Sequence, residues 1–158
     1  MLNIIDLIQE GKLFHNEYAS QSEYFSDISE YLLNLDLVTS DFREALEARE
    51  FKYPTGLLTR SRIIALPHVD SKYVKKNAVF ITCFKTPIDF RRMDDVNIIV
   101  PVTISFLLLI EDINLHTKAV QQLATIFQSD VLNQIYNAKD NNQVIKLIGR
   151  KFYESNDW

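Results

Sequence analysis

The segment IIVPVTISFLLLI, residues 98–110, is the most apolar run of the chain and indicates its fold class. Its 13 residues are too few to cross a bilayer as a helix, which takes about 20 residues, but they suit a buried strand. Nearly every residue from 104 to 110 is apolar, a pattern typical of a strand whose sheet is covered by helices on both faces. Because helical patterns come both before and after the strands, we expect an α/β layered sandwich.

The spacing of apolar residues on either side of this run predicts further strands and helices. Further strands rich in Val, Ile and Phe are expected at 63–66 and 78–84, and another near 12–15. Helices are expected at 2–9, 21–34, 41–51, 116–127, 129–137 and 140–152. Ser20 is the expected N-cap of the second helix, and Thr39 or Ser40 that of the third, because a short hydroxyl side chain accepts a hydrogen bond from the first turn. The motif YPTG at 53–56 predicts a turn.

The composition is that of one ordinary domain. The chain has 158 residues, of which 47% are hydrophobic, and no repeat or Gly/Ser linker divides it, so we expect a single domain over residues 1–158. The net charge of −4 argues against a nucleic-acid partner, and no run is long enough for membrane insertion. The first residues lack a signal-peptide pattern, and the single cysteine, Cys83, excludes an internal disulfide. Both features predict a soluble, cytoplasmic protein.

Charge is distributed unevenly along the chain. Residues 1–50 hold 11 acidic and 3 basic residues, whereas residues 51–92 hold 2 acidic and 9 basic ones, and His68 lies within this basic half. Positive surroundings suit an anionic ligand or an acidic partner. A solvated basic face without a partner would have the same composition, so the alternative stays open here.

Three residues could carry chemistry. His68 follows the strand at 63–66 and Pro67, whose ring fixes one backbone torsion, and a neutral imidazole at a rigid strand end can attack phosphorus without a separate base. Arg49, near the end of the third helix, could make a forked contact to a phosphate. His116, where the long strand gives way to a helix, could donate to a phosphoryl oxygen. Taken singly, each has an ordinary structural alternative: a histidine bonded to a carbonyl, an arginine paired with a glutamate along its helix, and a capping or surface histidine.

Other kinds of site have no support in the sequence pattern. The histidines and Cys83 lack the spacing of metal ligands, and the chain contains no GxxxxGK[ST], GxSxG or GxGxxG motif. Cys83 stands among apolar residues of an expected strand, so we interpret it as a buried packing residue. His15 is assigned no role. We therefore expect no metal and no cofactor.

The order of the elements in REFKYPTGLLTRSRIIALPH, residues 49–68, resembles one protein family. It is similar to the enzyme IIA component of the bacterial phosphoenolpyruvate-dependent sugar phosphotransferase system, fructose–mannitol class (type 2), and most similar to the galactitol-type members. The resemblance covers most of the chain and implies a three-layer sandwich, with a mixed β-sheet of about five strands and helices on both faces. It also implies that His68 is the phosphorylated histidine, and that Arg49 and His116 stabilise the phosphoryl group. Three residues that are ambiguous one by one would then form one site.

The resemblance further implies a relay of phosphoryl groups. HPr would be the donor to His68, and a cysteine of enzyme IIB would be the acceptor, from which the group passes to a sugar such as galactitol during transport by the membrane component, enzyme IIC. The basic segment 52–92 would form a docking surface near the site, and no metal or nucleotide would be needed. An alternative function is a regulatory, nitrogen-type protein whose phosphorylation state controls a partner. A domain that only binds proteins is a third alternative, against which the intact His68 and Arg49 argue.

Overall fold

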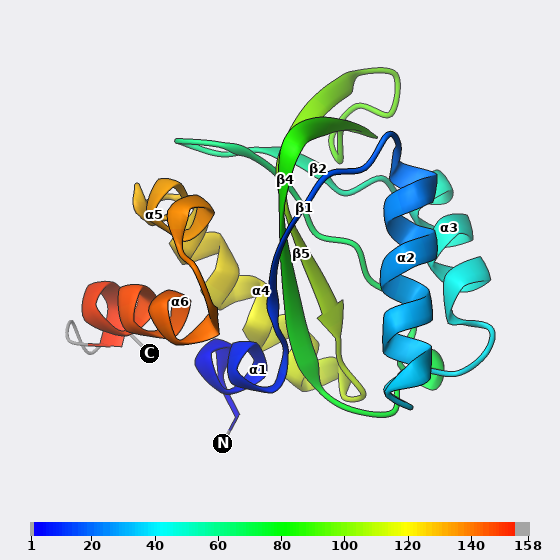
Figure 1. The fold of residues 1–158 in the computed structure, drawn as a ribbon, viewed down its shortest axis with the longest axis horizontal. Coiled ribbons are helices and arrows are strands. Elements are labelled where there is room, and N and C mark those ends of the chain that lie inside the picture. The colour runs from blue at the N-terminus through cyan, green and yellow to red at the C-terminus, as the bar shows by residue number, and fades with distance from the viewer. Residues whose placement is uncertain (1, 154–158) are drawn as a thin grey trace.

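The fold is built on a five-stranded sheet of mixed direction, seen in a computed structural model that describes residues 2–153 (Figure 1). The strand order is β1-β4-β5-β3-β2. The β4–β5 and β2–β3 pairs are antiparallel, whereas β1–β4 and β3–β5 are parallel. The strands are β1 (Leu13–Asn16), β2 (Gly56–Leu58), β3 (Ile63–Ala65), β4 (Ala78–Arg91) and β5 (Ile99–Leu109). The expected mixed sheet of about five strands is confirmed.

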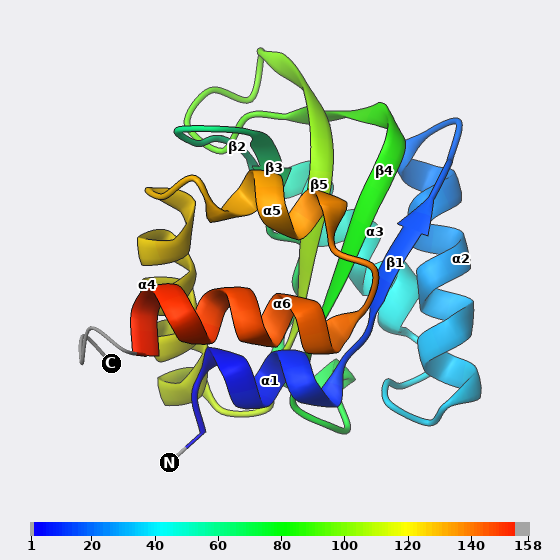
Figure 2. The ribbon, with the colours of Figure 1, turned by 60° about the vertical axis from the view of Figure 1, so that its left-hand side comes forward.

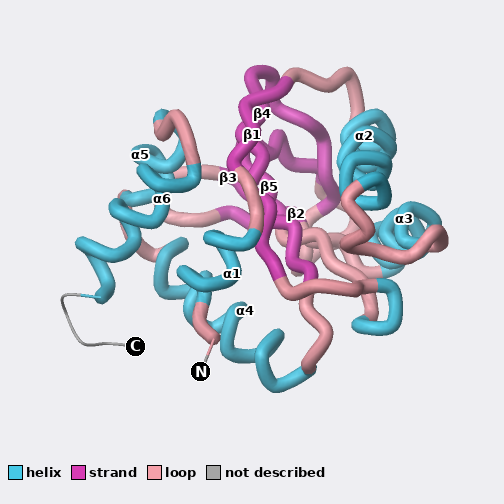
Figure 3. The backbone as a smooth tube through the Cα atoms, turned by 60° about the horizontal axis from the view of Figure 1, so that its bottom comes forward, coloured by secondary structure: helices cyan, strands magenta, loops and turns pink. Residues whose placement is uncertain are grey.

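Helices cover both faces of this sheet, as predicted from the apolar run at 104–110 (Figure 3). On one face pack α1 (Ile4–Glu10), α4 (Ile113–Phe127), α5 (Val131–Asn137) and α6 (Asn141–Ile148). On the other face pack α2 (Gln21–Asn34) and α3 (Phe42–Lys52). Alternate residues of β5 serve the two cores: Phe106 and Leu108 belong to the first, and Leu107 and Leu109 to the second. One strand therefore holds the three layers together.

Four of the α-helices within residues 2–153 start with a side-chain cap, whereas α3 and α5 start without one. Ser20 is the N-cap of α2, and its hydroxyl accepts a hydrogen bond from Glu23 N–H, as predicted. The prediction that Thr39 or Ser40 caps the next helix is wrong, because α3 begins at Phe42 with Asp41 in the N-cap position. Thr39 is held outside the helix, since its N–H donates to the Tyr73 carbonyl. Ser40 and Asp41 then form a turn, closed by a hydrogen bond from Phe42 N–H to the Thr39 carbonyl, from which α3 starts.

The expected helices at both ends are present with shifted bounds. Helix α1 begins at Ile4 behind a capping box made by Asn3 and Asp6. Helix α4 begins at Ile113, three residues before the predicted start, because Asp112 is its N-cap. The predicted helix at 140–152 is divided into α6 and a π-helical turn, η2 (Gly149–Tyr153). Figure 2 shows α6 lying alongside α1, so the two ends of the described chain pack together. No helix within residues 2–153 has both the length and the apolar character needed to cross a membrane.

Two strand features were missed by the sequence analysis. Strand β4 runs on to Arg91 through an irregularity between Cys83 and Ile88, past the predicted end at 84. The YPTG segment is a turn only in part, because Gly56 opens the edge strand β2. Gly56 also bridges to the end of β4, where its carbonyl accepts a hydrogen bond from Met93 N–H. A side chain at this position would meet the Arg91 carbonyl oxygen at 2.6 Å, so the close approach of β2 and β4 requires glycine.

Candidate functional site

His68 lies just beyond β3, on a stretch of chain still attached to the sheet. It bridges to Leu108 of β5, and Leu108 N–H donates to the carbonyl of Pro67. The imidazole Nδ1 lies 2.8 Å from the Leu66 carbonyl oxygen. Because a carbonyl can only accept, Nδ1 carries the proton and Nε2 keeps its lone pair. The ring is therefore fixed in position and in tautomer, with its nucleophilic nitrogen free of this bond.

Arg49 reaches the same place from the last turn of α3. Its Nη1 lies 3.7 Å from a carboxylate oxygen of Asp70, and its guanidinium lies 5.4 Å from the centre of the Tyr53 ring. The side chain is about one-third exposed, yet Nε is buried and has no hydrogen-bond partner among the described residues. Such a buried donor is costly unless a group with acceptor oxygens meets it. The structure thus offers a forked donor with unused capacity.

His116 comes from the opposite side, in the first turn of α4. Its backbone N–H donates to the Asp112 carbonyl, and its ring centre lies 4.9 Å from that of His68 at an interplanar angle of 55°. The buried Nε2 of His116 has no hydrogen-bond partner within residues 2–153. This placement brings a second imidazole beside the first, with the N-terminal turn of a 15-residue helix behind it.

The three predicted residues line one pocket of about 300 Å³. Asp70 and Asp112 face it too, and Ile113 stands on its rim with 79% of its surface exposed. None of these three was singled out from the sequence. Asp112 was recognisable as a helix cap, but the pairing of Asp70 with Arg49 arises only when α3 meets the end of β3.

Burial dominates the electrostatics of the two histidines. It lowers the pKa of His68 to about 4, against the opposing effect of the Leu66 carbonyl, and nearby His116 and Arg49 lower this pKa further. Burial and Arg49 also lower the pKa of His116. His68 is therefore neutral at physiological pH, in the form that can act as a nucleophile. No three side chains of the described residues form a cluster able to hold a metal ion.

The remaining sequence candidates lie elsewhere. Three basic residues of 52–92 pair with acids remote in sequence: Lys75 with Asp36, Lys76 with Glu10, and Arg60 with Asp130. Cys83 is buried in β4, and burial raises the pKa of its thiol to about 12, so it packs as expected. His15 contacts the Ala138 carbonyl through Nε2 and is not among the residues that line the pocket.

Comparison with known proteins gives a family and several relatives. The family described as "Phosphoenolpyruvate-dependent sugar phosphotransferase system, EIIA 2" matches residues 6–151. The galactitol-specific EIIA component of the phosphotransferase system from Escherichia coli K12 is 26% identical over 119 residues, which cover 75% of this chain and 79% of that protein.

Solved structures share the fold. A putative phosphotransferase-system IIA domain from Streptococcus pyogenes M1 GAS superposes with a TM-score of 0.75 at 20% identity, covering 100% of both chains. The complex of enzyme IIAMTL with phosphorylated enzyme IIBMTL from Escherichia coli matches with a TM-score of 0.67 at 16% identity, covering 88% of this chain and 94% of the other. At these identities the likeness establishes a common architecture.

Proposed function

Because this chain belongs to the EIIA type 2 family of the phosphoenolpyruvate-dependent sugar phosphotransferase system, we propose that it carries phosphoryl groups on His68. The observation that carries the proposal is the meeting of His68, Arg49 and His116 in one pocket from three separate elements. The family match to residues 6–151 also supports treating residues 1–158 as one EIIA domain, although residues 1 and 154–158 lie outside the described part.

Nε2 of His68 is the proposed nucleophile, because Nδ1–H donates a hydrogen bond to the Leu66 carbonyl oxygen and leaves the lone pair on Nε2. Its lone pair attacks the phosphorus of a phosphorylated donor protein. The new Nε2–P bond forms as the donor's bond to phosphorus breaks, and the electron pair of that bond stays on the donor. The Nδ1–H remains on the ring and keeps its bond to the Leu66 carbonyl, which stabilises the positive charge that develops on the imidazole.

Arg49 and His116 are proposed to hold the phosphoryl oxygens. Phosphoryl transfer needs donors aimed at the equatorial oxygens before the reaction begins. The unpartnered Nε of Arg49 and Nε2 of His116 are donors of this kind, provided that His116 carries its proton on Nε2. The carboxylates of Asp70 and Asp112 at the pocket limit the net positive charge, which favours passing the group onward over retaining it.

The partners follow from the family. We propose HPr as the donor and a cysteine of enzyme IIB as the acceptor. In the second step the cysteine sulfur attacks phosphorus, the S–P bond forms as the Nε2–P bond breaks, and the electron pair of the broken bond returns to Nε2. The known complex of a IIA relative with a phosphorylated IIB supports the second step. The galactitol-specific relatives support galactitol or a related sugar as the transported compound, carried by enzyme IIC. A cytoplasmic location is part of this proposal and rests on the proposed donor.

Intact-mass spectrometry tests the proposal. Wild type, His68→Ala and the control His15→Gln are incubated with phosphoenolpyruvate, enzyme I and HPr. We expect one acid-labile phosphoryl group on wild type and on His15→Gln, and none on His68→Ala. Phosphorylation of folded His68→Ala would refute the site, and no gain on wild type beside phosphorylated HPr would refute the donor. Adding galactitol-type IIB then separates transport from regulation, because only the transport function predicts loss of the label to IIB.

A further inference from the structure

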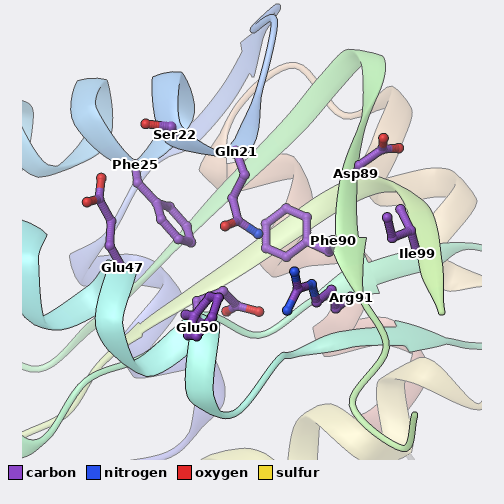
Figure 4. Close-up of a pocket in the computed structure, with 10 residues that line it drawn as sticks. Gln21, Ser22, Phe25, Glu47, Glu50, Asp89, Phe90, Arg91 and Ile99 are labelled. Carbon is purple, nitrogen blue, oxygen red and sulfur yellow. The ribbon is translucent and has the colours of Figure 1, made fainter. Parts of the chain in front are cut away.

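The buried carboxylate of Glu50 lies next to Arg49 in sequence but faces away from the pocket of His68. Only 5% of Glu50 is exposed, and it lines a second pocket, of about 350 Å³, on the α2–α3 side of the sheet. Figure 4 shows the Glu50 carboxylate pointing inward from α3, while the carboxylate of Glu47 leaves the same helix in another direction. Burying a carboxylate is costly unless its oxygens accept hydrogen bonds.

Both oxygens of this carboxylate bind the same residue five positions later. Glu50 Oε2 accepts a hydrogen bond from the backbone N–H of Thr55 at 2.6 Å, and Oε1 accepts one from the Thr55 hydroxyl at 2.8 Å. Together these two bonds tie the end of α3 to the turn that leads into β2. Burial raises the pKa of Glu50 to about 7, against the lowering effect of both Thr55 bonds.

Thr55 in turn holds the segment that leads from β3 to His68. The Thr55 carbonyl accepts a hydrogen bond from Leu66 N–H at 3.3 Å, and the Leu66 carbonyl accepts the bond from His68 Nδ1. The path from the Glu50 carboxylate to the imidazole therefore consists of two residues, each fixed by hydrogen bonds on both sides. The same clasp fixes the turn of α3 that carries Arg49.

We propose that Glu50 and Thr55 form a positioning clasp that sets the tautomer and placement of His68 and the position of Arg49. Neither residue touches the phosphoryl group. The inference rests on the proposed function for its kinetic consequence, but the tautomer of His68 can be measured without any phosphoryl transfer.

Four variants separate this role from simple stability. Glu50→Ala removes both bonds and Thr55→Val removes only the hydroxyl bond. Glu50→Gln keeps two bonds, since its amide oxygen can accept from Thr55 N–H while its NH₂ donates to the Thr55 hydroxyl oxygen. Glu47→Ala is the matched control, because Glu47 lies one turn earlier on α3 and pairs with the exposed side chain of Arg43.

The readouts are the ¹⁵N shifts of the His68 ring, which report the proton on Nδ1 or Nε2, and the rate of phosphorylation by phospho-HPr. We expect a roughly 10- to 100-fold slower rate in Glu50→Ala, as for a misplaced reacting group, and about a 2- to 10-fold loss in Thr55→Val. In both variants the fraction with the proton on Nδ1 falls, while Glu50→Gln and Glu47→Ala match wild type.

A folded Glu50→Ala or Thr55→Val with the wild-type tautomer and rate would overturn the clasp. If Glu50→Ala does not fold, the tautomer in Thr55→Val decides alone. If wild type accepts no phosphoryl group, the proposed function fails while the ring shifts still test the clasp. A slower rate in Glu50→Ala and Thr55→Val with an unchanged His68 tautomer would overturn the proposal that the clasp sets this tautomer, because the defect would then act on Arg49 alone.

Discussion

Replacing each of the chain's three glycines by alanine makes the same chemical change at three sites with different amounts of space. At Gly149 an added Cβ meets nothing within 4 Å, and the backbone is helical with φ −58° and ψ −47°. At Gly56 it meets the Arg91 carbonyl oxygen at 2.6 Å, and at Gly11 it meets the Val79 carbonyl oxygen at 1.8 Å. Ordinary contact begins at 3.4 Å, so the shortfalls are about 0.8 Å and 1.6 Å, both against the backbone of β4.

These shortfalls set the expected changes in the free energy of unfolding. Gly149→Ala should gain about 0.5–1 kcal/mol, the usual advantage of alanine over glycine in a helix. Gly56→Ala should lose about 1–3 kcal/mol, the usual cost of overpacking. Gly11→Ala should lose more than about 3 kcal/mol, because β1 must move away from the β4 strand with which it pairs.

Urea unfolding followed by far-ultraviolet circular dichroism measures this series. With a denaturant slope of about 2 kcal/mol/M, a loss of about 2 kcal/mol moves the midpoint down by about 1 M, which is easily resolved. The reasoning predicts the order Gly149→Ala, wild type, Gly56→Ala, Gly11→Ala from most to least stable. It would be refuted by a Gly11→Ala protein within about 0.5 kcal/mol of wild type, or by one more stable than Gly56→Ala.

Three further predictions concern single residues. Arg49→Ala should slow phosphorylation of His68 about 10- to 100-fold yet change the unfolding free energy by less than about 1 kcal/mol, because its 3.7 Å contact with Asp70 is partly solvated; unchanged kinetics would remove Arg49 from the site. Burial lowers the pKa of His68 from 6.5 to about 4, so between these pH values the unfolded state binds a proton on this ring that the folded state does not. The free energy of unfolding is therefore highest above pH 6.5 and decreases as the pH falls toward 4. An NMR titration of the ring should have its midpoint near pH 4, and a midpoint above 6 would contradict the burial argument. Cys83 should resist a thiol reagent at pH 8 in the native protein and react fully in urea, since burial raises its pKa to about 12; fast reaction of the native protein is the contrary result.

Most of the fold was predictable because its signals are local. The apolar run of β5 and the Ser20 cap of α2 each act within a few residues, and both predictions are confirmed. The missed features depend on distant partners. Gly56 looks like a turn glycine, and only the approach of Arg91 from β4 makes it part of a strand pair. Thr39 has the chemistry of a cap, but its backbone is taken by Tyr73.

The site was predictable in its members but not in its arrangement. Arg49 and His68 were selected from the motif at 49–68 and His116 from its place between a strand and a helix, and the structure brings the three into one pocket. Their role in phosphoryl transfer is a prediction. The ion pairs of the basic residues could not be predicted. Nine basic residues in 51–92 suggest a positive patch around His68, whereas Lys75 pairs with Asp36 and Lys76 with Glu10. A sum of charges along the chain does not determine which charges share a surface.

The sheet has a short strand at each edge. β1 offers four residues at one edge and β2 three at the other, and the Gly56 carbonyl of β2 is already occupied by Met93 N–H. Unpaired strand edges are the usual starting points for polymerisation of one chain onto another. Edges as short as these leave another chain little free backbone on which an aggregate could grow.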